Sequence, residues 1–535
     1  MKIHLTYLQF FFYLPLAFAQ TPGGGSGTVS EGKADEYFRA GNYPAALKQY
    51  YQLAKKDSTN IEYRHRLASC YLRCNTDKKK AVPHLEYIAD KKKNNPDFLY
   101  ELGLAYHYAL KFDFAVKTYN QYKELTKKTD VDRLIEMCNN GKNFIRTPVN
   151  VTFENIGLGV NTEYPDYYPW VTIDENVLVF TSRRPSNIGG KDVDFDGLRP
   201  SDIYTASVIK GEFAKPQNLG ALVNTSLDEQ AVGISPDAGQ IVIYIDWIEM
   251  FGDLLYTKKQ GKSYVKTESM GENINTPELE TAGTISPGGN VLYFSSKTIG
   301  GQGGSDIYLS RLLPDGSWGP RENLGPVINT QYNEDFPYLY PDEIHIYFSS
   351  DGHNSMGGYD LFKSTFDTIK KVWSKPENLG YPINTPDDNM NISFSATWEW
   401  NDDGTEKILS SQYAYVSTWR PDSKGDLDIY RIKFNNVEPR YTRVRGTLTA
   451  KIPAANKQFT SESVPEAEIT VTNDVSGDIY GTYRARNGKY ILALEPGKYS
   501  LSLEAPGYKS YEEKVTIFDK GSFVEEIVKD IAITK

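Results

Sequence analysis

The sequence predicts a multidomain chain with α-helical repeats first, then a β-propeller of five blades, then a small β-sandwich. Three observations support this order. Small and aromatic residues recur at helical spacing near the N-terminal end, a motif-rich period of about fifty residues fills the middle, and alternating residues with a tight-turn dipeptide occupy the last part. The alternative to five blades is a propeller of six, with the sixth completed by flanking strands.

The composition agrees with several globular domains. The chain has 535 residues, 39% of them hydrophobic, which is too long for a single core and too apolar for disorder. Its 39 tyrosines add to an aromatic content that favours strands. The formal net charge of -10 argues against nucleic-acid binding, because phosphate recognition needs a basic surface. We therefore expect no nucleic-acid partner.

Residues 1–19 are predicted to be a secretory signal peptide. Lys2 supplies the positive start, residues 8–18 are nearly all apolar, and Ala17-Phe18-Ala19 has the small-residue pattern of a cleavage site. The apolar core is too short to span a bilayer, and no later segment has the required length. No Cys follows the cleavage site, so no lipid anchor is expected. Residues 20–30 are Gly-rich and predict a flexible leader. We expect an exported protein whose mature chain has no transmembrane segment and lies in the periplasm.

Residues 31–146 are predicted to form helical repeats. Small residues recur 34 and 35 residues apart, and an aromatic residue follows each of them: Ala34 and Tyr37, Ala68 and Tyr71, Gly103 and Tyr106. The pattern resembles the tetratricopeptide repeat, in which small residues let paired helices approach while aromatic residues fill the gap. Pro96 falls where such a repeat usually ends. The resemblance implies a concave groove for a peptide or helix of a partner.

Several other residues of the helical region have structural interpretations. For Cys70, Cys74 and Cys138, the only cysteines, we expect buried thiols, with a bridge from Cys138 to one of the other two as the alternative. The basic runs 78–80 and 91–93 are expected to be solvated at helix ends. A capping helix is expected at 131–140, with Gly141 just beyond its end.

Residues 149–436 are predicted to form the propeller. An Asn-Thr pair recurs at Asn161, Asn224, Asn275, Asn329 and Asn384. An acidic-aliphatic-aromatic motif recurs at Asp202, Asp253, Asp306, Asp360 and Asp428. Because this Asp recurs in each blade, we expect it to fix the preceding turn by accepting backbone N–H bonds rather than to act in catalysis. The whole region resembles the PD40 or TolB-like propeller family, which is related to WD40 proteins.

Residues 441–535 are predicted to form the β-sandwich. Residues 464–471 alternate as a strand does, and Asn487-Gly488 is a strong tight-turn signal between two strands. The segment resembles the carboxypeptidase regulatory-like domain. That resemblance implies a small sandwich that is not itself catalytic.

The sequence offers no constellation for catalysis, so we expect neither enzyme activity nor a bound cofactor. Gly-x-Ser-x-Gly is absent, and no His has triad spacing. Asp192, Asp194 and Asp196 alternate before Gly197, as in loops that hold Ca²⁺. Ile203 stands where the bidentate Glu of such a loop would be. We favour a solvated acidic insertion, and a Ca²⁺ site formed by the three aspartates is the alternative.

The order of domains resembles the periplasmic PorE-type proteins of the type IX secretion and gliding machinery of Bacteroidota. The resemblance implies a non-catalytic scaffold that links protein partners in the cell envelope, including a PorP-type outer-membrane barrel. In that family an OmpA-like domain usually follows the sandwich. This sequence ends at Lys535 without one, so peptidoglycan binding is not expected.

Two other functions are alternatives to the scaffold. The central pocket of the propeller could bind envelope glycans or peptides, with Trp247, Trp398, Trp400 and Trp419 as candidate stacking residues. A hydrolase is the third hypothesis, and it lacks an identifiable nucleophile.

Overall fold

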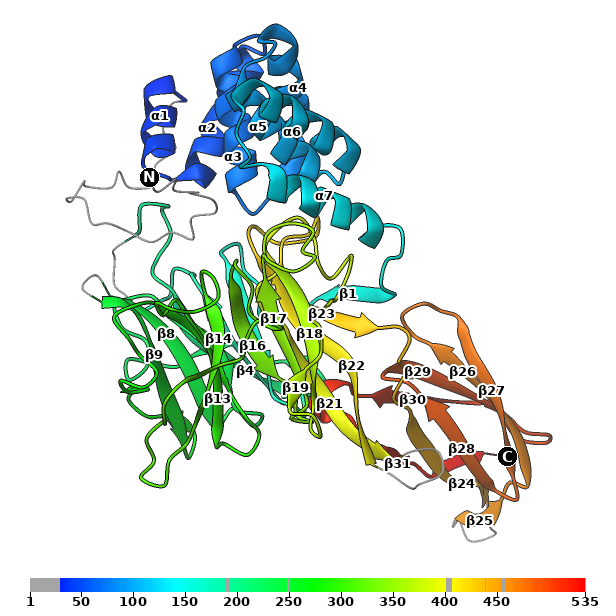
Figure 1. Ribbon diagram of the computed structural model, residues 1–535. Helices are drawn as coiled ribbons and strands as arrows, with labels where there is room; N and C mark the ends of the chain where they lie inside the picture. Colours follow the sequence, from blue (N-terminus) through cyan, green and yellow to red (C-terminus); the bar gives the residue numbers. More distant parts are fainter. Residues whose placement is uncertain are drawn as a thin grey trace. The chain divides into compact units, whose positions relative to one another are not determined.

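The computed structural model describes residues 29–188, 193–247, 250–400, 407–437, 439–453 and 459–534 (Figure 1). The predicted signal peptide, most of the leader and Asp192 lie outside these ranges. The chain forms two compact units. The first contains the helices and most of the propeller, and the second contains residues 436–535 with the short stretches 174–176 and 207–214.

The helical part consists of paired α-helices and a last helix, as predicted. Its elements are α1 (Glu31–Arg39), α2 (Tyr43–Lys56), α3 (Ile61–Arg73), η1 (Lys78–Ala81), α4 (Val82–Lys91), α5 (Pro96–Tyr108), α6 (Phe112–Thr126) and α7 (Asp132–Phe144). Asn42, Asn60 and Asn95 cap α2, α3 and α5 by accepting backbone N–H bonds. A Cβ on Gly103 would collide with the ring of Tyr119, so this small residue lets α5 and α6 approach closely. Among the described helices, none is long and apolar enough to cross a membrane.

One predicted helix boundary is wrong. Gly141 lies within α7 rather than beyond it, because the ring of Phe112 occupies the place of its missing side chain. Pro96 begins α5 and so stands at the junction where one helical pair ends and the next begins, and a proline at the first helical position leaves no N–H without a partner. The three cysteines are buried free thiols, and burial raises the pKa of each.

The propeller has five blades (Figure 1). Blade 1 contains β2 (Asp166–Val171), β3 (Val177–Ser182), β4 (Asp202–Ile209), β5 (Glu212–Phe213) and β6 (Gln217–Asn218). Blade 2 contains β7 (Glu229–Ile234), β8 (Gln240–Trp247), β9 (Met250–Gln260), β10 (Ser263–Tyr264) and β11 (Glu268–Ser269). Blade 3 contains β12 (Glu280–Ile285), β13 (Val291–Ser296), β14 (Asp306–Arg311) and β15 (Glu322–Asn323).

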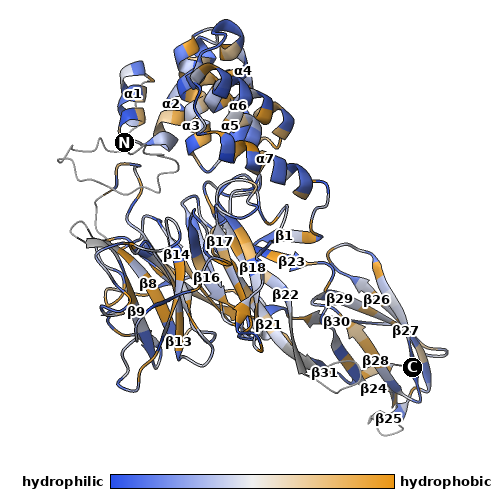
Figure 2. Cartoon of the chain, viewed as in Figure 1, coloured by the Kyte–Doolittle hydropathy of each residue, from blue (hydrophilic) through white to orange (hydrophobic). Residues whose placement is uncertain are grey.

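The last two blades complete the ring. Blade 4 contains β16 (Glu334–Leu339), β17 (His345–Ser350), β18 (Asp360–Asp367), β19 (Val372–Trp373) and β20 (Glu377–Asn378). Blade 5 contains β21 (Ser393–Trp400), β22 (Lys407–Thr418), β23 (Asp428–Phe434) and β1 (Val151–Asn155). β1 pairs antiparallel with β23, with Val151 opposite Phe434, so the flanking strand completes blade 5 instead of building a sixth. Contacts among β2, β7, β12, β16 and β21 show that these strands, one from each blade, lie nearest the centre. Hydrophobic residues run along β8 in blade 2 (Figure 2).

The repeated asparagine joins the third strand of each blade to the segment that follows the blade. In blade 3, Oδ1 of Asn329 accepts from the N–H of Ile307 at 2.8 Å, and Nδ2 of Asn329 donates to the carbonyl of Ile307 at 3.0 Å. The amide thus pairs with the backbone as a neighbouring strand would. The same pair of bonds links Asn161 to Ile429, Asn224 to Ile203, Asn275 to Leu254 and Asn384 to Leu361.

The repeated aspartate has the structural role that the sequence predicts. In four blades it accepts a backbone N–H from the loop before its strand: Asp202 from Ile188, Asp306 from Gln302, Asp360 from Met356 and Asp428 from Lys424. The same carboxylates accept from the side chains of Asn218, Asn323, Asn378 and Asn155, which begin or end the outer strands. The motif therefore ties each turn to the outer edge of its own blade.

A buried acidic residue links neighbouring blades at four of the five junctions, and at the fifth, from blade 4 to blade 5, Asn389 accepts from the N–H of Thr385 instead. Thr330, at the end of blade 3, donates both its N–H and its hydroxyl to Glu334, which begins β16 of blade 4. Equivalent bonds join Thr162 to Asp166, Thr225 to Glu229 and Thr276 to Glu280. Burial raises the pKa of Glu229 and of Glu334 to about 7, against the opposing effect of these hydrogen bonds.

The second unit contains the predicted β-sandwich. Its elements are β24 (Thr442–Pro453), β25 (Phe459–Ser463), β26 (Glu466–Asn473), β27 (Ile479–Arg486), β28 (Lys489–Leu494), β29 (Gly497–Glu504), β30 (Tyr511–Ile517), η2 (Lys520–Ser522), β31 (Glu526–Val528) and β32 (Ile531–Thr534). Asn487 and Gly488 have φ of 50° and 67° and join β27 to β28, as the tight-turn prediction requires. Buried Val, Ile, Leu and Tyr side chains of both faces form the core.

We predict that Asn329→Ala destabilises the propeller by about 2–4 kcal/mol, because the buried N–H and carbonyl of Ile307 would lose their partners. The free energy of unfolding in urea measures this effect. Asn354→Ala, at an exposed position before β18, is the matched control and should change stability little. Equal stability of the two variants would contradict the role assigned to the repeated asparagine.

We predict that the propeller loses stability as the pH rises from about 5 to 8. The raised pKa of Glu334 means that the folded state favours the protonated carboxyl, so its contribution is present below the usual Glu range and is lost as pH passes through about 7. Glu334→Gln stays neutral and should flatten the fall in Tm by a few degrees. Glu322→Gln, at an exposed position in β15, should keep the slope of the wild type. A Glu334→Gln slope as steep as the wild type would refute the assignment.

Candidate binding cavity of the propeller

A central cavity of about 220 Å³ opens at the end of the propeller where the innermost strands begin. All five blades contribute to its wall, because β2, β7, β12 and β16 and the segment before β21 converge there. Leu279 and Met390 supply aliphatic surface, and aromatic and charged side chains supply most of the rest. A concave site with a few convergent polar groups is where propellers bind ligands.

Aromatic rings form much of the cavity wall. The ring centroids of Tyr168 and Phe336 lie 4.5 Å apart, and those of Tyr167 and Tyr168 lie 4.7 Å apart. Tyr168 and Phe336 occupy equivalent positions at register shifts in β2 and β16, with φ of 50° and 48°. Bulky residues rarely adopt this left-handed region, which costs on the order of 1–3 kcal/mol each. The bulges therefore hold two rings at the cavity in a strained conformation.

Charged side chains line the rest of the cavity, and acidic groups are in excess. Arg183 forms ion pairs with both Asp194 and Asp196. Asp228 accepts from the N–H and the hydroxyl of Ser201, at 2.8 and 2.9 Å. Asp335 accepts from the hydroxyl of Thr281 and the N–H of Phe336, at 2.7 and 2.8 Å, and Lys297 also lies in the wall.

The acidity of two of these carboxyl groups is reduced. Burial, together with the negative charge of Asp228, raises the pKa of Asp194 to about 6 in spite of its contact with Arg183. Burial also raises the pKa of Asp335, which the bond from Thr281 opposes. The cavity thus brings carboxyl groups together where water is scarce, which disfavours their charged form unless a cation is near.

Two of the three aspartates of the predicted Ca²⁺ loop, Asp194 and Asp196, line this cavity. Asp192 is outside the described residues, whereas Asp194 and Asp196 both pair with Arg183. A Ca²⁺ ion bound by the two aspartates would have to compete with that guanidinium. Within the described ranges no group of three His, Cys, Asp or Glu side chains has the arrangement of a metal site. The Ca²⁺ site remains a prediction.

None of the four tryptophans predicted to stack on a ligand is among the described residues that line the cavity. The side chains of Trp247, Trp398 and Trp400 lie outside the part that the structure describes. Trp419 follows β22 and is half-buried, and it is not among the residues that line the cavity. Tyr and Phe residues of the innermost strands form the aromatic wall instead, and the sequence pattern did not distinguish them from ordinary core residues.

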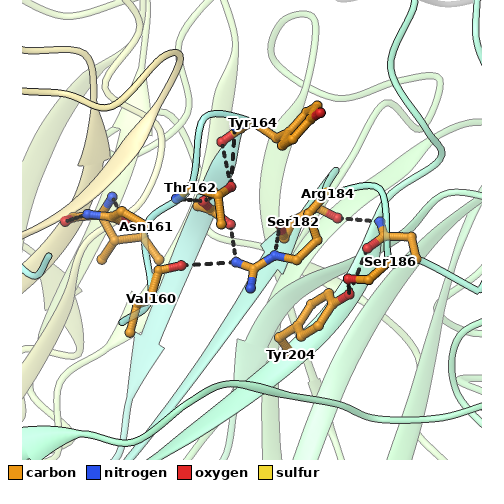
Figure 3. Close-up of polar contacts among 11 residues, drawn as sticks. Val160, Asn161, Thr162, Tyr164, Ser182, Arg184, Ser186 and Tyr204 are labelled. Carbon is orange, nitrogen blue, oxygen red and sulfur yellow. Dashed lines mark hydrogen bonds and ion pairs between the residues drawn. The ribbon is translucent and has the colours of Figure 1, made fainter. Parts of the chain in front are cut away.

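Arg184, the neighbour of Arg183, serves ring closure rather than the cavity (Figure 3). Its guanidinium donates to the carbonyl of Val160 at 3.0 Å and to the hydroxyl of Ser182 at 2.8 Å, and it pairs with Asp166. It also lies 4.6 Å from the ring centre of Tyr204. Blade 1 is thereby tied to the segment that leads from β1, which is the seam of the ring.

A loop of blade 4 is buried in the core of the helical part. Met356, between β17 and β18, is fully buried among the residues of the helical core. The Arg133 guanidinium of α7 donates to the carbonyls of Asp351 and Gly352, both at 2.6 Å, and of His353. Nε2 of His107 lies 2.8 Å from the Met356 carbonyl. Helices and propeller are therefore joined by packing as well as by the chain.

A second contact corrects a prediction about the basic runs. Lys78 was expected to be solvated, but it pairs with Asp387 of the propeller and lies 4.3 Å from the ring centre of Tyr108. Its contact partner is 309 residues away in sequence, which no local pattern reveals.

Comparisons with known proteins give one family match and several structural likenesses. Among curated protein sequences none matches the chain. TolB from Acinetobacter baumannii is 14% identical with a TM-score of 0.30, over 51% of this chain and 56% of that one, so the match spans little more than half of that protein. A putative TolB from Agrobacterium tumefaciens is 16% identical with a TM-score of 0.26, over 49% and 97%.

An α-L-arabinofuranosidase from Lactobacillus brevis is similar at 12% identity with a TM-score of 0.30, over 52% of this chain and 93% of that one. Likenesses this distant support no inference about function. The family match covers residues 457–527, which fit the carboxypeptidase regulatory-like domain. The β-sandwich region of this chain thus contains a carboxypeptidase regulatory-like domain, as its strand and turn pattern predicts.

Proposed function

We propose that this protein is a non-catalytic adaptor that binds partner proteins of the cell envelope. One observation carries the proposal: the loop around Met356 is buried among the helices, so two surfaces suited to binding belong to one compact unit. Helical repeats present extended faces to partner segments, and propellers present loops on a stiff base. A fixed arrangement of two such surfaces suits an adaptor, because it holds two partners at a set spacing.

The use of polar residues in the propeller supports binding rather than turnover. The aspartates and glutamates that recur from blade to blade bond to backbone N–H groups and to Thr and Asn side chains of the same ring. Arg183 is held by two aspartates, and Asp228 and Asp335 are held by neighbouring donors. These groups stabilise the ring and its cavity.

The resemblance in domain order supports a more specific proposal for the location of the protein and for its partners. The protein would act in the periplasm, in association with the outer membrane, within the type IX secretion or gliding machinery. A PorP-type outer-membrane barrel is the proposed partner of first choice. Peptidoglycan binding is not part of the proposal.

A second candidate function is a binding module for envelope glycans or peptides in the propeller cavity. The observation that favours it is the cavity itself, with aromatic rings and hydrogen-bonded carboxylates converging from all five blades. This function is compatible with the adaptor, because a partner protein could carry the group that enters the cavity.

The first helices of the repeats provide the test surface. α1, α3 and α5 lie side by side, since the Tyr63 hydroxyl donates to Glu31 and the Ser69 hydroxyl donates to Glu101. Glu62 is exposed and Tyr63 and Arg66 are half-buried, and we call these three residues the α3 face. Deletion of all the helices would be a poor test, because it would also expose Met356.

We predict that Tyr63→Ala with Arg66→Glu on the α3 face weakens partner binding about ten-fold or more, by removing an aromatic anchor and reversing a charge. Affinity purification of the mature protein from native envelope, with quantitative mass spectrometry, measures retention of each partner. Lys117→Glu on the exposed side of α6 is the matched control and should retain the partners. Unchanged retention by the α3-face variant would count against the adaptor.

A further inference from the structure

We propose that the propeller cavity binds an alkyl cation of the kind carried by lysine and arginine side chains. The proposal rests on the second candidate function, in which the cavity is a binding site, and it names the chemistry of the ligand. Charge, the fixed positions of the acidic groups and the aromatic wall each support it.

The charge balance of the cavity favours a cation. Among the described residues that line the cavity, four carboxylates, those of Asp194, Asp196, Asp228 and Asp335, face two cationic side chains, Arg183 and Lys297. Arg183 pairs with Asp194 and Asp196, which leaves one negative charge in excess on that side. Asp228, whose charge acts on Asp194, adds a second on the same side, and Lys297 balances Asp335. An anionic ligand such as a phosphate would be repelled, whereas a cation would balance the excess.

Asp228 and Asp335 are held in place by hydrogen bonds before any ligand binds. Both hydrogen bonds that Asp228 makes in the described structure go to its Oδ1, from the N–H and the hydroxyl of Ser201. Oδ2 of Asp228 can therefore accept from a ligand while the side chain stays fixed. Asp335 is anchored by Thr281 and by the N–H of Phe336, the residue that follows it. Preorganised acceptors of this kind favour binding because little ordering remains to be done.

The aromatic wall selects an organic cation over a metal ion. Tyr167, Tyr168 and Phe336 form a contiguous group of rings, and Leu279 and Met390 add aliphatic surface. An ammonium or guanidinium group gains from the faces of such rings, and an alkyl stem gains from the apolar wall. Ca²⁺ instead requires six to eight oxygen ligands, which a wall of rings does not supply.

The strained backbone of the wall is consistent with a binding role. Tyr168 and Phe336 both adopt φ near 50°, each at a register shift in its innermost strand. The two strands come from blades 1 and 4, which are not neighbours in the chain, and the rings meet at the cavity. Such strain persists where the surrounding structure over-determines it, and it is concentrated at ligand sites.

Isothermal titration of the mature protein tests the proposal. The probes are the tripeptides Gly-Lys-Gly and Gly-Arg-Gly, with Gly-Gln-Gly and Gly-Glu-Gly as neutral and acidic counterparts, all with blocked termini. We expect at least one basic peptide to bind about ten-fold more tightly than the neutral one, and its affinity to fall as salt is added. Butylamine distinguishes the source: tighter binding of the peptide points to a protein-borne side chain, and equal binding points to a free amine, and both support a cation.

Three results would overturn the proposal. These are equal binding of the basic and neutral peptides, no binding of either basic peptide at 10 mM, and, where both basic peptides bind, failure of each to displace the other. Tighter binding of cellotriose or of CaCl₂ than of the basic peptides would assign the cavity to a glycan or to a metal ion instead.

Asp228→Asn provides the matched variant, because the amide keeps an oxygen for Ser201 and removes the charge. Its affinity for the basic peptide should fall about ten-fold while its Tm stays close to the wild type. Asp315→Asn, in an exposed turn of blade 3, is the control and should bind as the wild type does. Unchanged affinity of Asp228→Asn would refute the proposal. The adaptor is tested separately by partner retention in the α3-face variant, so the two ideas can fail independently.

Discussion

The pairing of a side-chain amide with a strand backbone is the interaction on which the propeller depends. Short outer strands leave part of the third strand of each blade without a full neighbour, and an asparagine amide supplies the missing donor and acceptor there. Because the asparagine is followed by a threonine bonded to the next blade, one dipeptide closes one blade and positions the next. Because this unit is repeated around the ring, a set of local contacts closes the propeller into a disc.

The cavity follows from the same construction. Four innermost strands, β2, β7, β12 and β16, begin at the residue that accepts from the threonine of the previous blade, so these strand starts are brought together at one end of the disc. The register shifts just after these starts turn side chains such as Tyr168 and Phe336 toward the axis. The charged residues of the wall come from the same strand starts and from the loops beside them.

The sequence predicts what is periodic and misses what occurs once. The number of blades, the role of the repeated Asp202, Asp306, Asp360 and Asp428, and the helical pairs all repeat, so their spacing alone indicates them. The Asn487-Gly488 turn is predictable because its conformation depends on local residue types. By contrast, three features depend on contacts between segments that the sequence pattern does not connect. They are the burial of Met356 in the helical core, the ion pair of Lys78 with Asp387, and the different partners of Arg183 and Arg184. No period marks them, so their roles required the three-dimensional structure.

The buried loop around Met356 has a mechanical consequence. The peptide segment after α7 leads directly into β1 of blade 5, while the loop of blade 4 is held among the helices by Arg133 and His107. Two attachments on adjacent blades restrict rotation of the helices relative to the propeller, whereas a single linker would permit it. A pulling force on the repeats would thus be shared by both blades and carried into the closed ring, and the helices would tend to move as a lever fixed to the disc.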